Sequence, residues 1–234
     1  MSDSSRATPA PAEFEARDDY GNFEANLRFL EGAGAANAGS RLLEIGTGKA
    51  RMLAELLARG LDARGVESNP WMLDESRRLY GDLPVTLVSG HRLPFPDRSF
   101  DLVVSFDVFE HIADSDAHLR EVRRVLTPGG RYLLQTPNKW TNSVFETIRW
   151  RSLTAWRQDH CALHSHAELR RRFAAHGFDV RFHDVPVVTD FFRRKVRRYL
   201  GAPGVAALKV LNPDRFPMPL RTNFYVEAIM RDAV

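Results

Sequence analysis

The chain has 234 residues, of which 44% are hydrophobic, and its 33 Lys and Arg against 30 Asp and Glu give a formal net charge of +3. That length suffices for one substantial core and little more than one domain. No stretch approaches the roughly 18 apolar residues of a membrane span, and the opening MSDSSRATPAPA lacks the basic-then-apolar order of a secretory signal. We therefore expect a cytoplasmic protein with a disordered lead over 1–12 and a single domain over 13–234.

Cysteine usage and charge distribution narrow the possibilities further. The single cysteine, Cys161, excludes an internal disulfide and a multi-cysteine zinc site, and we expect it to be a small buried side chain. Residues 139–200 contain 13 Lys and Arg against 6 Asp and Glu, a net charge of +7 that leaves −4 for the rest of the chain. An anionic substrate or surface would dock on this basic third.

From Arg41 onward, short runs rich in leucine and β-branched residues alternate with helical patterns. The runs predict strands over 41–45, 62–67, 84–88, 101–106 and 131–136, and the patterns between them predict helices over 50–59, 70–80, 115–126 and 165–176. Asn69 before Pro70 is typical of a helix start, and Thr127–Gly130 is predicted to end a helix and turn into the next strand. Such alternation predicts an α/β fold: a Rossmann-like, doubly wound, mostly parallel sheet with helices on both faces.

The pattern changes after the run FDVRFHD. A Pro- and Arg-rich insertion over 185–222 precedes a last strand, Asn223–Met230, which we expect to be antiparallel and at or near the sheet edge. The insertion contains TDFFRRKVRRYLG, which predicts an amphipathic helix with Phe192, Val196, Tyr199 and Leu200 on one stripe and a cationic rim.

Four roles stay open for this basic helix. Its apolar stripe docks it on the domain with the arginines in solvent, or it forms a lid over the acceptor, contacts anionic lipid, or contacts phosphate backbones. The apolar segment APGVAALKVL that follows favours a lid, or an anionic membrane surface contacted through 190–211, over RNA.

A Gly-x-Gly turn, Gly46-Thr47-Gly48, follows the first predicted strand, where a doubly wound sheet binds its ligand. A tight structural turn would use the same glycines. Position 51 requires a small residue in the dinucleotide fingerprint and is Arg51 here, and the loop lacks the spacing of a P-loop. Glu44, just before the turn, would repel phosphate but attract an ammonium group.

A second carboxylate, Glu67, stands at the end of the second predicted strand, 19 residues after Gly48. At this position a carboxylate accepts hydrogen bonds from both hydroxyls of a ribose. A ligand with an amino-acid group and a ribose but no phosphate is S-adenosylmethionine.

Over about residues 40–184 the chain resembles the class I S-adenosylmethionine-dependent methyltransferases. The resemblance is carried, in order, by LEIGTGKA, GVESNPWML, LPFPDRSFDLVVSFDVFEHI, VLTPGGRYLLQTPN and ELRRRFAAHGFDV. It implies that the Glu44–Gly48 loop cradles the methionine part of the cofactor, that Glu67 binds the ribose, and that the following residues flank the adenine. The cofactor-binding residues that it implies are Glu44, Gly46, Thr47, Gly48, Glu67, Ser68, Ser89, Gly90 and Phe106.

The chain departs from the family pattern at two places in the cofactor site. Ala50 replaces the third glycine of the loop. Where relatives often carry an acid that binds the adenine amino group, this chain has Ser89-Gly90-His91-Arg92, which leaves adenine to Ser89 or to a backbone group.

Asp107, Glu110 and His111 have the i, i+3, i+4 spacing of one helical face. They form either a hydrogen-bonded scaffold under the cofactor loop or part of a metal site. The second interpretation resembles the small-RNA 2′-O-methyltransferases and the ubiquinone-pathway O-methyltransferases; in the RNA enzymes an Asp-His after Thr-Pro-Asn completes the site. Here Thr136-Pro137-Asn138 and Asp159-His160 match, although the first ligand is Asp107 rather than Glu. The resemblance implies Mg²⁺ or Mn²⁺ on Asp107, Glu110, His111 and His160.

Methyl transfer needs alignment and desolvation, with at most one base. His160, His164 and His166 cluster after the fifth strand; His160 is the preferred base, His164 the second, and His111 a further catalytic candidate. Aromatic residues in the preceding segment either cap a flat acceptor or form the core of a helix packed over the site. They are Trp140, Phe145, Trp150 and Trp156.

The expected function is methyl transfer from S-adenosylmethionine to an oxygen, or secondarily a nitrogen, of a small-molecule, sugar-linked or lipid-linked acceptor. Metal-assisted 2′-O-methylation of RNA is an alternative, although no RNA-binding module is recognisable and a nucleic acid is not the expected partner. A scaffold that keeps the fold without catalysis is another alternative. Contact with a membrane would make the cytoplasmic protein peripheral.

Overall fold

The computed structural model describes residues 22–35, 39–88, 92–150, 152–154 and 160–231. The predicted lead over 1–12 and the predicted roles of Ser89, Gly90, Trp156 and Asp159 fall outside these ranges. For Trp150 the structure gives only its place in a helix.

Seven strands form one sheet in the order β3-β2-β1-β4-β5-β7-β6. β1 to β5 are parallel, and β7 is antiparallel to both of its neighbours, β5 and β6. The doubly wound α/β prediction is therefore confirmed, with the antiparallel last strand one place in from the edge. The strands are β1 (Arg41–Ile45), β2 (Asp62–Glu67), β3 (Val85–Leu87), β4 (Phe100–Phe106), β5 (Leu126–Pro137), β6 (Phe178–His183) and β7 (Asn223–Met230).

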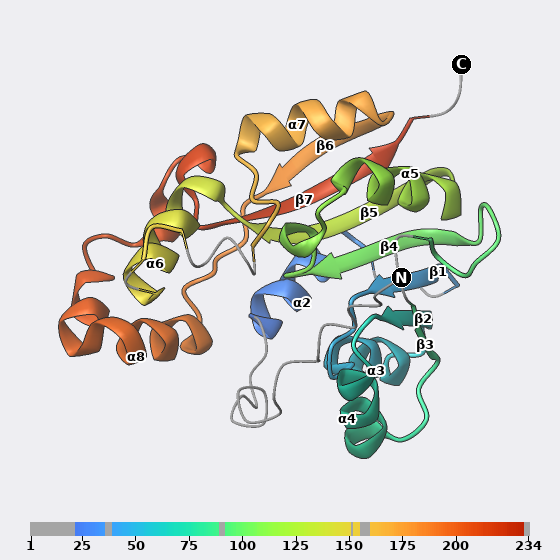
Figure 1. Cartoon of the computed structure of the whole chain (residues 1–234), viewed down its shortest axis with the longest axis horizontal. Helices are drawn as coiled ribbons and strands as arrows, with labels where there is room; N and C mark the ends of the chain where they lie inside the picture. Colours follow the sequence, from blue (N-terminus) through green and yellow to red (C-terminus); the bar gives the residue numbers. More distant parts are fainter. Residues whose placement is uncertain (1–21, 36–38, 89–91, 151, 155–159, 232–234) are drawn as a thin grey trace, which may run out of the picture.

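Helices cover both faces of this sheet (Figure 1). Side chains of α5 and α7 share one buried cluster with the sheet, and those of α2 and α3 share a second one. None of the described helices is long and apolar enough to cross a membrane. The helices are α2 (Phe23–Gly32), α3 (Arg51–Ala58), α4 (Pro70–Tyr80), α5 (Ser115–Val125), α6 (Lys139–Trp150), α7 (His166–Ala175) and α8 (Asp190–Ala207), with short 3₁₀ turns η1 (Phe109–His111), η3 (Pro213–Arg215) and η4 (Met218–Leu220).

Local signals place the helix starts where the sequence predicts them. The Asn69 side chain accepts a hydrogen bond from the Trp71 N–H at 3.0 Å, with Pro70 in the first turn of α4. Ser165 and Glu168 form a capping box at the start of α7. Each cap satisfies backbone donors that a helix start leaves unpaired.

The junction between α5 and β5 differs from the prediction. Thr127–Gly130 does not separate the two elements, because β5 already begins at Leu126, paired with Phe100. A register shift between Phe100 and Leu102 accommodates these residues, and Gly129 takes a φ of +71°. The turn is therefore an irregularity inside the strand.

The insertion and α6 lie together beyond the carboxyl ends of β4 and β5 (Figure 1). α8 forms as predicted but is kinked at Gly201, where φ is 65° and ψ is −163°. The rings of Phe145 on α6 and Tyr199 on α8 meet edge to face, with centroids 5.6 Å apart. These two helices therefore flank the end of the sheet at which the candidate site lies.

Candidate functional site

The Gly46–Gly48 loop is built for close approach of its backbone. Gly46 has a φ of +73°, and a Cβ there would lie 2.4 Å from Cγ2 of Val108. Its N–H donates to the Val66 carbonyl at 2.8 Å, which fixes the loop against β2. Gly48 also has a positive φ, +54°, but a Cβ there would meet no atom within 4 Å. Open space thus lies directly over Gly48.

Ala50 completes this loop in a strained conformation. Its φ of 58° is in the left-handed region, which costs a residue with a Cβ roughly 1–2 kcal/mol. The glycine that relatives carry here would adopt this conformation freely. The substitution changes the strain of the turn and leaves its path intact.

Glu67, at the end of β2, is tied to the loop by its carboxylate. One oxygen accepts the Gly48 N–H at 2.7 Å, and the other accepts the N–H groups of Ser68 at 2.8 Å and Asn69 at 2.9 Å. A carboxylate has about four lone-pair positions, so the oxygen facing Gly48 keeps capacity for a further donor. Glu67 therefore organises the cradle, and its predicted bond to a ribose stays a prediction.

Glu44 and Thr47 each carry a buried oxygen without a hydrogen-bond partner among the described residues. Burial, reinforced by the charge of Glu67, raises the pKa of Glu44 to about 8. A buried polar atom without a partner is costly in free energy. The pair therefore indicates a missing polar ligand at this turn.

These observations fit the amino-acid end of S-adenosylmethionine. An ammonium group would satisfy the free oxygen of Glu44 and stabilise its ionised form. The space over Gly48 admits the ligand where a Cβ would obstruct it. The residues at this turn are thus compatible with the predicted cofactor; the turn's two cations, Lys49 and Arg51, lie over the rings of Trp71 and Phe23.

Other predicted cofactor residues surround the cradle less closely. Phe106 is half-buried at the end of β4, and Ser68 is exposed after β2. Arg51, which departs from the dinucleotide pattern, places its guanidinium 4.0 Å from the ring centroid of Phe23. α2, which the sequence did not predict, is in this way held beside the loop.

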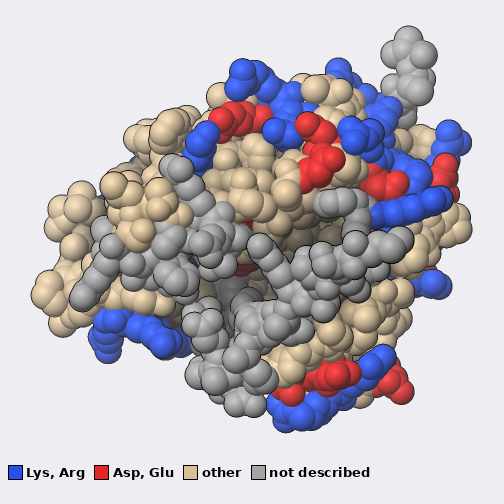
Figure 2. Space-filling view, viewed as in Figure 1, with Lys and Arg blue, Asp and Glu red and all other residues tan. Residues whose placement is uncertain are grey.

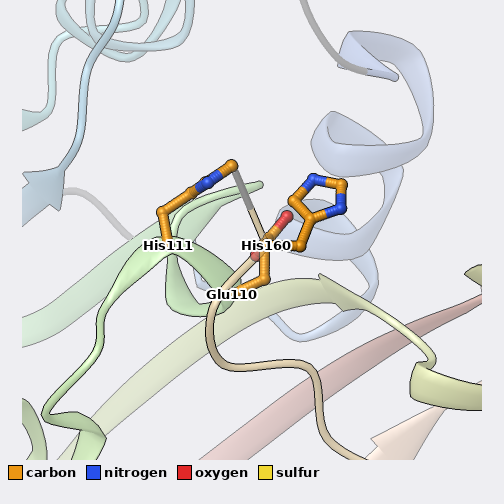
Figure 3. A group of neighbouring side chains, drawn as sticks. All are labelled: Glu110, His111 and His160. Carbon is orange, nitrogen blue, oxygen red and sulfur yellow. The ribbon is translucent and has the colours of Figure 1, made fainter. Parts of the chain in front are cut away.

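Three candidate metal ligands meet at the ends of β4 and the loop before α7 (Figure 3). Ligand atoms of Glu110, His111 and His160 all lie within 4.8 Å of one another. Glu110 is 1% exposed and accepts a hydrogen bond from the Thr136 hydroxyl at 3.1 Å. Burial, followed by the charge of Asp107, raises its pKa well above the usual value.

Asp107, the fourth predicted ligand, is not among the three residues whose ligand atoms lie close together. Its φ of 54° is in the left-handed region, and Gln135 accepts its N–H through the side-chain oxygen at 2.9 Å. Burial raises the pKa of Asp107, while the charges of Lys195 and His111 lower it. Backbone strain and a perturbed pKa at one residue are typical of a functional site.

The two candidate bases occupy different surroundings. His160 is half-buried beside His111, with ring centroids 5.1 Å apart, and its Nδ1 lies 3.2 Å from the Asn142 amide nitrogen of α6. His164 is 6% exposed and packs on Phe109, and its Nδ1 has no partner among the described residues. Burial lowers the pKa of His164. The structure thus places His160, and not His164, with Glu110 and His111.

His164 instead lines a hollow of about 610 Å³ between α5 and α7. Asp116 and Arg172 share its wall and pair with each other at 2.6 Å. This hollow lies on the helical face next to the three converging ligands, because the Ala162 N–H on its wall donates to the Glu110 carbonyl at 2.9 Å.

Asn138, the last residue of the Thr-Pro-Asn segment, has a structural role. Its amide donates to the carbonyls of Pro219 at 2.9 Å and Arg221 at 2.7 Å, and its oxygen accepts the Trp140 N–H at 3.1 Å. Those contacts join the start of α6 to the end of the insertion. The RNA interpretation gains no support from Asn138, because its side chain is fully engaged.

One side-chain prediction is wrong: Cys161 is exposed, with its thiol 3.7 Å from the Glu110 carbonyl oxygen. Trp140 is 61% exposed and so is not part of a helix core, whereas its role as a cap over an acceptor stays a prediction. Phe145, on the same helix, packs against Tyr199 of α8. α6 itself lies against His160 through Asn142.

Lys195 belongs to the cationic rim that was predicted for α8, without a role of its own in the predicted site. Its Nζ lies 4.8 Å from the ring centroid of Phe145, and its charge acts on Asp107. Phe192, Lys195, Val196 and Tyr199 follow i, i+3, i+4, i+7 spacing and lie on one side of α8, where Val196 is buried and Lys195 is exposed. That spacing is the signal that would have found Lys195.

Comparison with known proteins agrees with this geometry. The model of a family described as "Methyltransferase domain" matches residues 16–182. A probable S-adenosylmethionine-dependent methyltransferase of Mycolicibacterium smegmatis is 35% identical over 109 residues, 45% of this chain and 41% of that protein. A demethylmenaquinone methyltransferase of Deinococcus radiodurans is 39% identical over 105 residues, 42% of this chain and 44% of that protein. The chain thus spans less than half the length of these curated relatives.

Solved structures extend the likeness in fold. The YcgJ protein of Bacillus subtilis superposes with a TM-score of 0.62 and 19% identity, covering 90% of this chain and 100% of that one. At such identity the likeness concerns the fold alone. Since the family match spans more than half of the chain, the chain belongs to the methyltransferase domain family, in the class I, S-adenosylmethionine-dependent group.

Proposed function

We propose that the protein transfers a methyl group from S-adenosylmethionine to an oxygen, secondarily a nitrogen, of a small-molecule, sugar-linked or lipid-linked acceptor. The observation that carries the proposal is the cradle after β1: the buried, unpartnered oxygen of Glu44 beside the open space over Gly48. The name of one relative, demethylmenaquinone methyltransferase, supports a small-molecule acceptor.

The reaction needs few protein groups. A lone pair of the acceptor oxygen attacks the methyl carbon, the carbon–sulfur bond breaks with its electrons passing to sulfur, and S-adenosylhomocysteine leaves. The acceptor proton goes to a base. His160 is the proposed base, since it lies half-buried at the carboxyl ends of the strands and Asn142 holds its ring. The remaining contribution to catalysis would come from alignment of the acceptor with the methyl group under α6 and α8.

As an alternative to His160 acting as the base, we propose a divalent cation held by Glu110, His111 and His160; with His160 as a ligand, the acceptor proton would pass to water. A metal bound at about 2.1 Å to each atom requires ligand atoms within about 4.2 Å of one another, so the 4.8 Å grouping needs only a small contraction. Two imidazoles and one carboxylate suit Mn²⁺ or a later first-row ion better than Mg²⁺. Such an ion would lower the pKa of an acceptor hydroxyl.

A scaffold interpretation of the same residues makes a different prediction. Glu110 bonds Thr136 and, through its carbonyl, Ala162, contacts that would support the loop without any metal. Methyl transfer that survives exhaustive chelation and does not respond to added Mn²⁺ would favour the scaffold. Activity lost on chelation and restored by Mn²⁺ would favour the metal.

The function is tested in two steps. Calorimetry with S-adenosylmethionine should show binding, and absence of binding at millimolar ligand would favour a non-catalytic scaffold. Labelled S-adenosylmethionine is then incubated with small-molecule extracts, lipid extracts and RNA, and the labelled product is identified. Label in the small-molecule or lipid fraction supports the proposal, whereas label confined to RNA would replace it with the 2′-O-methylation alternative.

A further inference from the structure

The exposed apolar side chains of the protein are concentrated at one end. Among the described residues, eight of the eleven large hydrophobic side chains that are exposed lie within 140–153 and 200–220. The largest exposed fractions are those of Val210 at 82% and Leu153 at 75%. The eight are Trp140, Val144, Leu153, Leu200, Val210, Leu211, Phe216 and Leu220, and they are called the apolar end below.

Contacts between α6 and α8 bring these two stretches to the same end of the molecule. Phe145 meets Tyr199 edge to face, and Lys195 lies over the Phe145 ring. Figure 1 shows both helices beyond the ends of β4 and β5, away from the rest of the domain. Trp140 and Val144 are four residues apart on α6 and therefore share its outer face.

The kink in α8 separates the cationic part of the insertion from its apolar part. Before Gly201, the four arginines from Arg193 to Arg198 are exposed, while Val196 and Phe192 face the core. After Gly201, Val210 and Leu211 point outward. These two side chains follow the end of α8 at Ala207, so the segment after the helix leaves apolar side chains in water.

Basic side chains border the apolar end. Residues 190–220 include seven Lys and Arg and two Asp, a net charge of +5. Figure 2 shows Lys and Arg along the edge occupied by α8, next to a surface of other residues at the same end of the molecule. Apolar side chains within a basic border match the headgroup region of an anionic bilayer, where cations meet phosphates and apolar groups enter the acyl boundary.

We propose that the apolar end docks on the surface of an anionic lipid bilayer. The same helix that presents Trp140 and Val144 outward places Asn142 against His160, so the docked face adjoins the proposed catalytic cluster. A lipid-borne acceptor would then enter between α6 and α8 without crossing water. That last step rests on the proposed function, whereas docking does not.

Flotation with lipid vesicles tests the docking directly. The full chain should float with vesicles of phosphatidylcholine and phosphatidylglycerol and remain at the bottom with phosphatidylcholine alone. The double substitution Val210→Asp with Leu211→Asp should reduce the bound fraction by at least about tenfold, since both side chains are exposed and would otherwise enter the interface. Leu79→Asp with Leu87→Asp, at exposed positions outside the apolar end, is the matched control and should float normally.

Charge-reversal variants distinguish binding to an anionic bilayer from binding to another partner. Arg197→Glu with Arg198→Glu should abolish flotation, whereas Arg77→Glu with Arg78→Glu on α4 should not. Flotation equal on both vesicle types, or unchanged in the apolar and basic variants, would overturn the proposal. Retention on RNA without flotation would also overturn it and assign the basic border to nucleic acid. Cofactor binding measured on the same preparations is the separate test of the proposed function.

Discussion

The pKa of Glu44 gives the most direct experimental test of the predicted cofactor site. Its pKa of about 8 means that most of it is protonated at neutral pH in the ligand-free protein. A bound ammonium favours the ionised form and lowers that pKa, so cofactor binding releases a proton. We predict that affinity for S-adenosylmethionine rises with pH between 6 and 8 and levels off above the pKa of Glu44.

Calorimetry in buffers of different ionisation enthalpy measures this proton release. Glu44→Gln should weaken binding at pH 8 by about 1.5–3 kcal/mol and remove the pH dependence, because the amide cannot ionise. Glu55→Gln, on the following helix, is the control with the same chemical change. A pH slope that persists in the Glu44 variant would show that another group is responsible.

Patterns local in sequence identified most of the elements. Parallel strands are buried on both faces, so β1 and β4 stand out as largely apolar runs, whereas β2 carries Asp62, Arg64 and Glu67. The sequence pattern did not predict α2, because two of its four buried residues are Ala25 and Asn26, which do not mark an apolar face. The exposure of Trp140 escaped because the face of α6 that is covered depends on α8, far along the chain.

Some residues of the candidate site could likewise be predicted from local sequence, and others could not. Glu44, Gly46 and Glu67 follow strands directly, and the topology alone brings them together. The convergence of His160 with Glu110 and His111 was suggested by a family resemblance and could not be read from spacing. Lys195 reaches Asp107 only through the docking of α8, which depends on packing between segments remote in sequence.

The position of Lys195 on α8 leads to a prediction about the pKa of Asp107. The Lys195 charge lowers the pKa of Asp107, against the effect of burial. Lys195→Met should therefore raise the Asp107 pKa further, while Lys195→Arg should retain the wild-type value. Arg197→Met removes a charge from the exposed face of the same helix and should leave Asp107 unchanged. Carboxyl carbon chemical shifts followed by NMR against pH measure the three cases, and equal titration in all of them would place Lys195 outside the site.

At the scale of the whole molecule, the cofactor should act as a stabiliser of the sheet that it joins. S-adenosylmethionine at a hundred times its dissociation constant should add about 2.7 kcal/mol to the free energy of unfolding. For a protein of this size, each kcal/mol raises Tm by roughly 2–4 °C, which predicts a shift of about 5–10 °C. Differential scanning calorimetry with and without the cofactor gives the shift.

Substitution of two glycines with similar backbone conformations distinguishes the loss of cofactor binding from the effect of backbone strain. Gly48 and Gly60 have φ values of +54° and +79°, and a Cβ at either position would meet no protein atom within 4 Å. Gly48→Ala and Gly60→Ala should thus both lower stability by about 1–2 kcal/mol through the left-handed backbone. Only Gly48→Ala should lose the cofactor-induced rise in Tm, because its Cβ enters the cradle. If both variants kept that rise, the cofactor would lie elsewhere and the unpartnered oxygen of Glu44 would need another ligand.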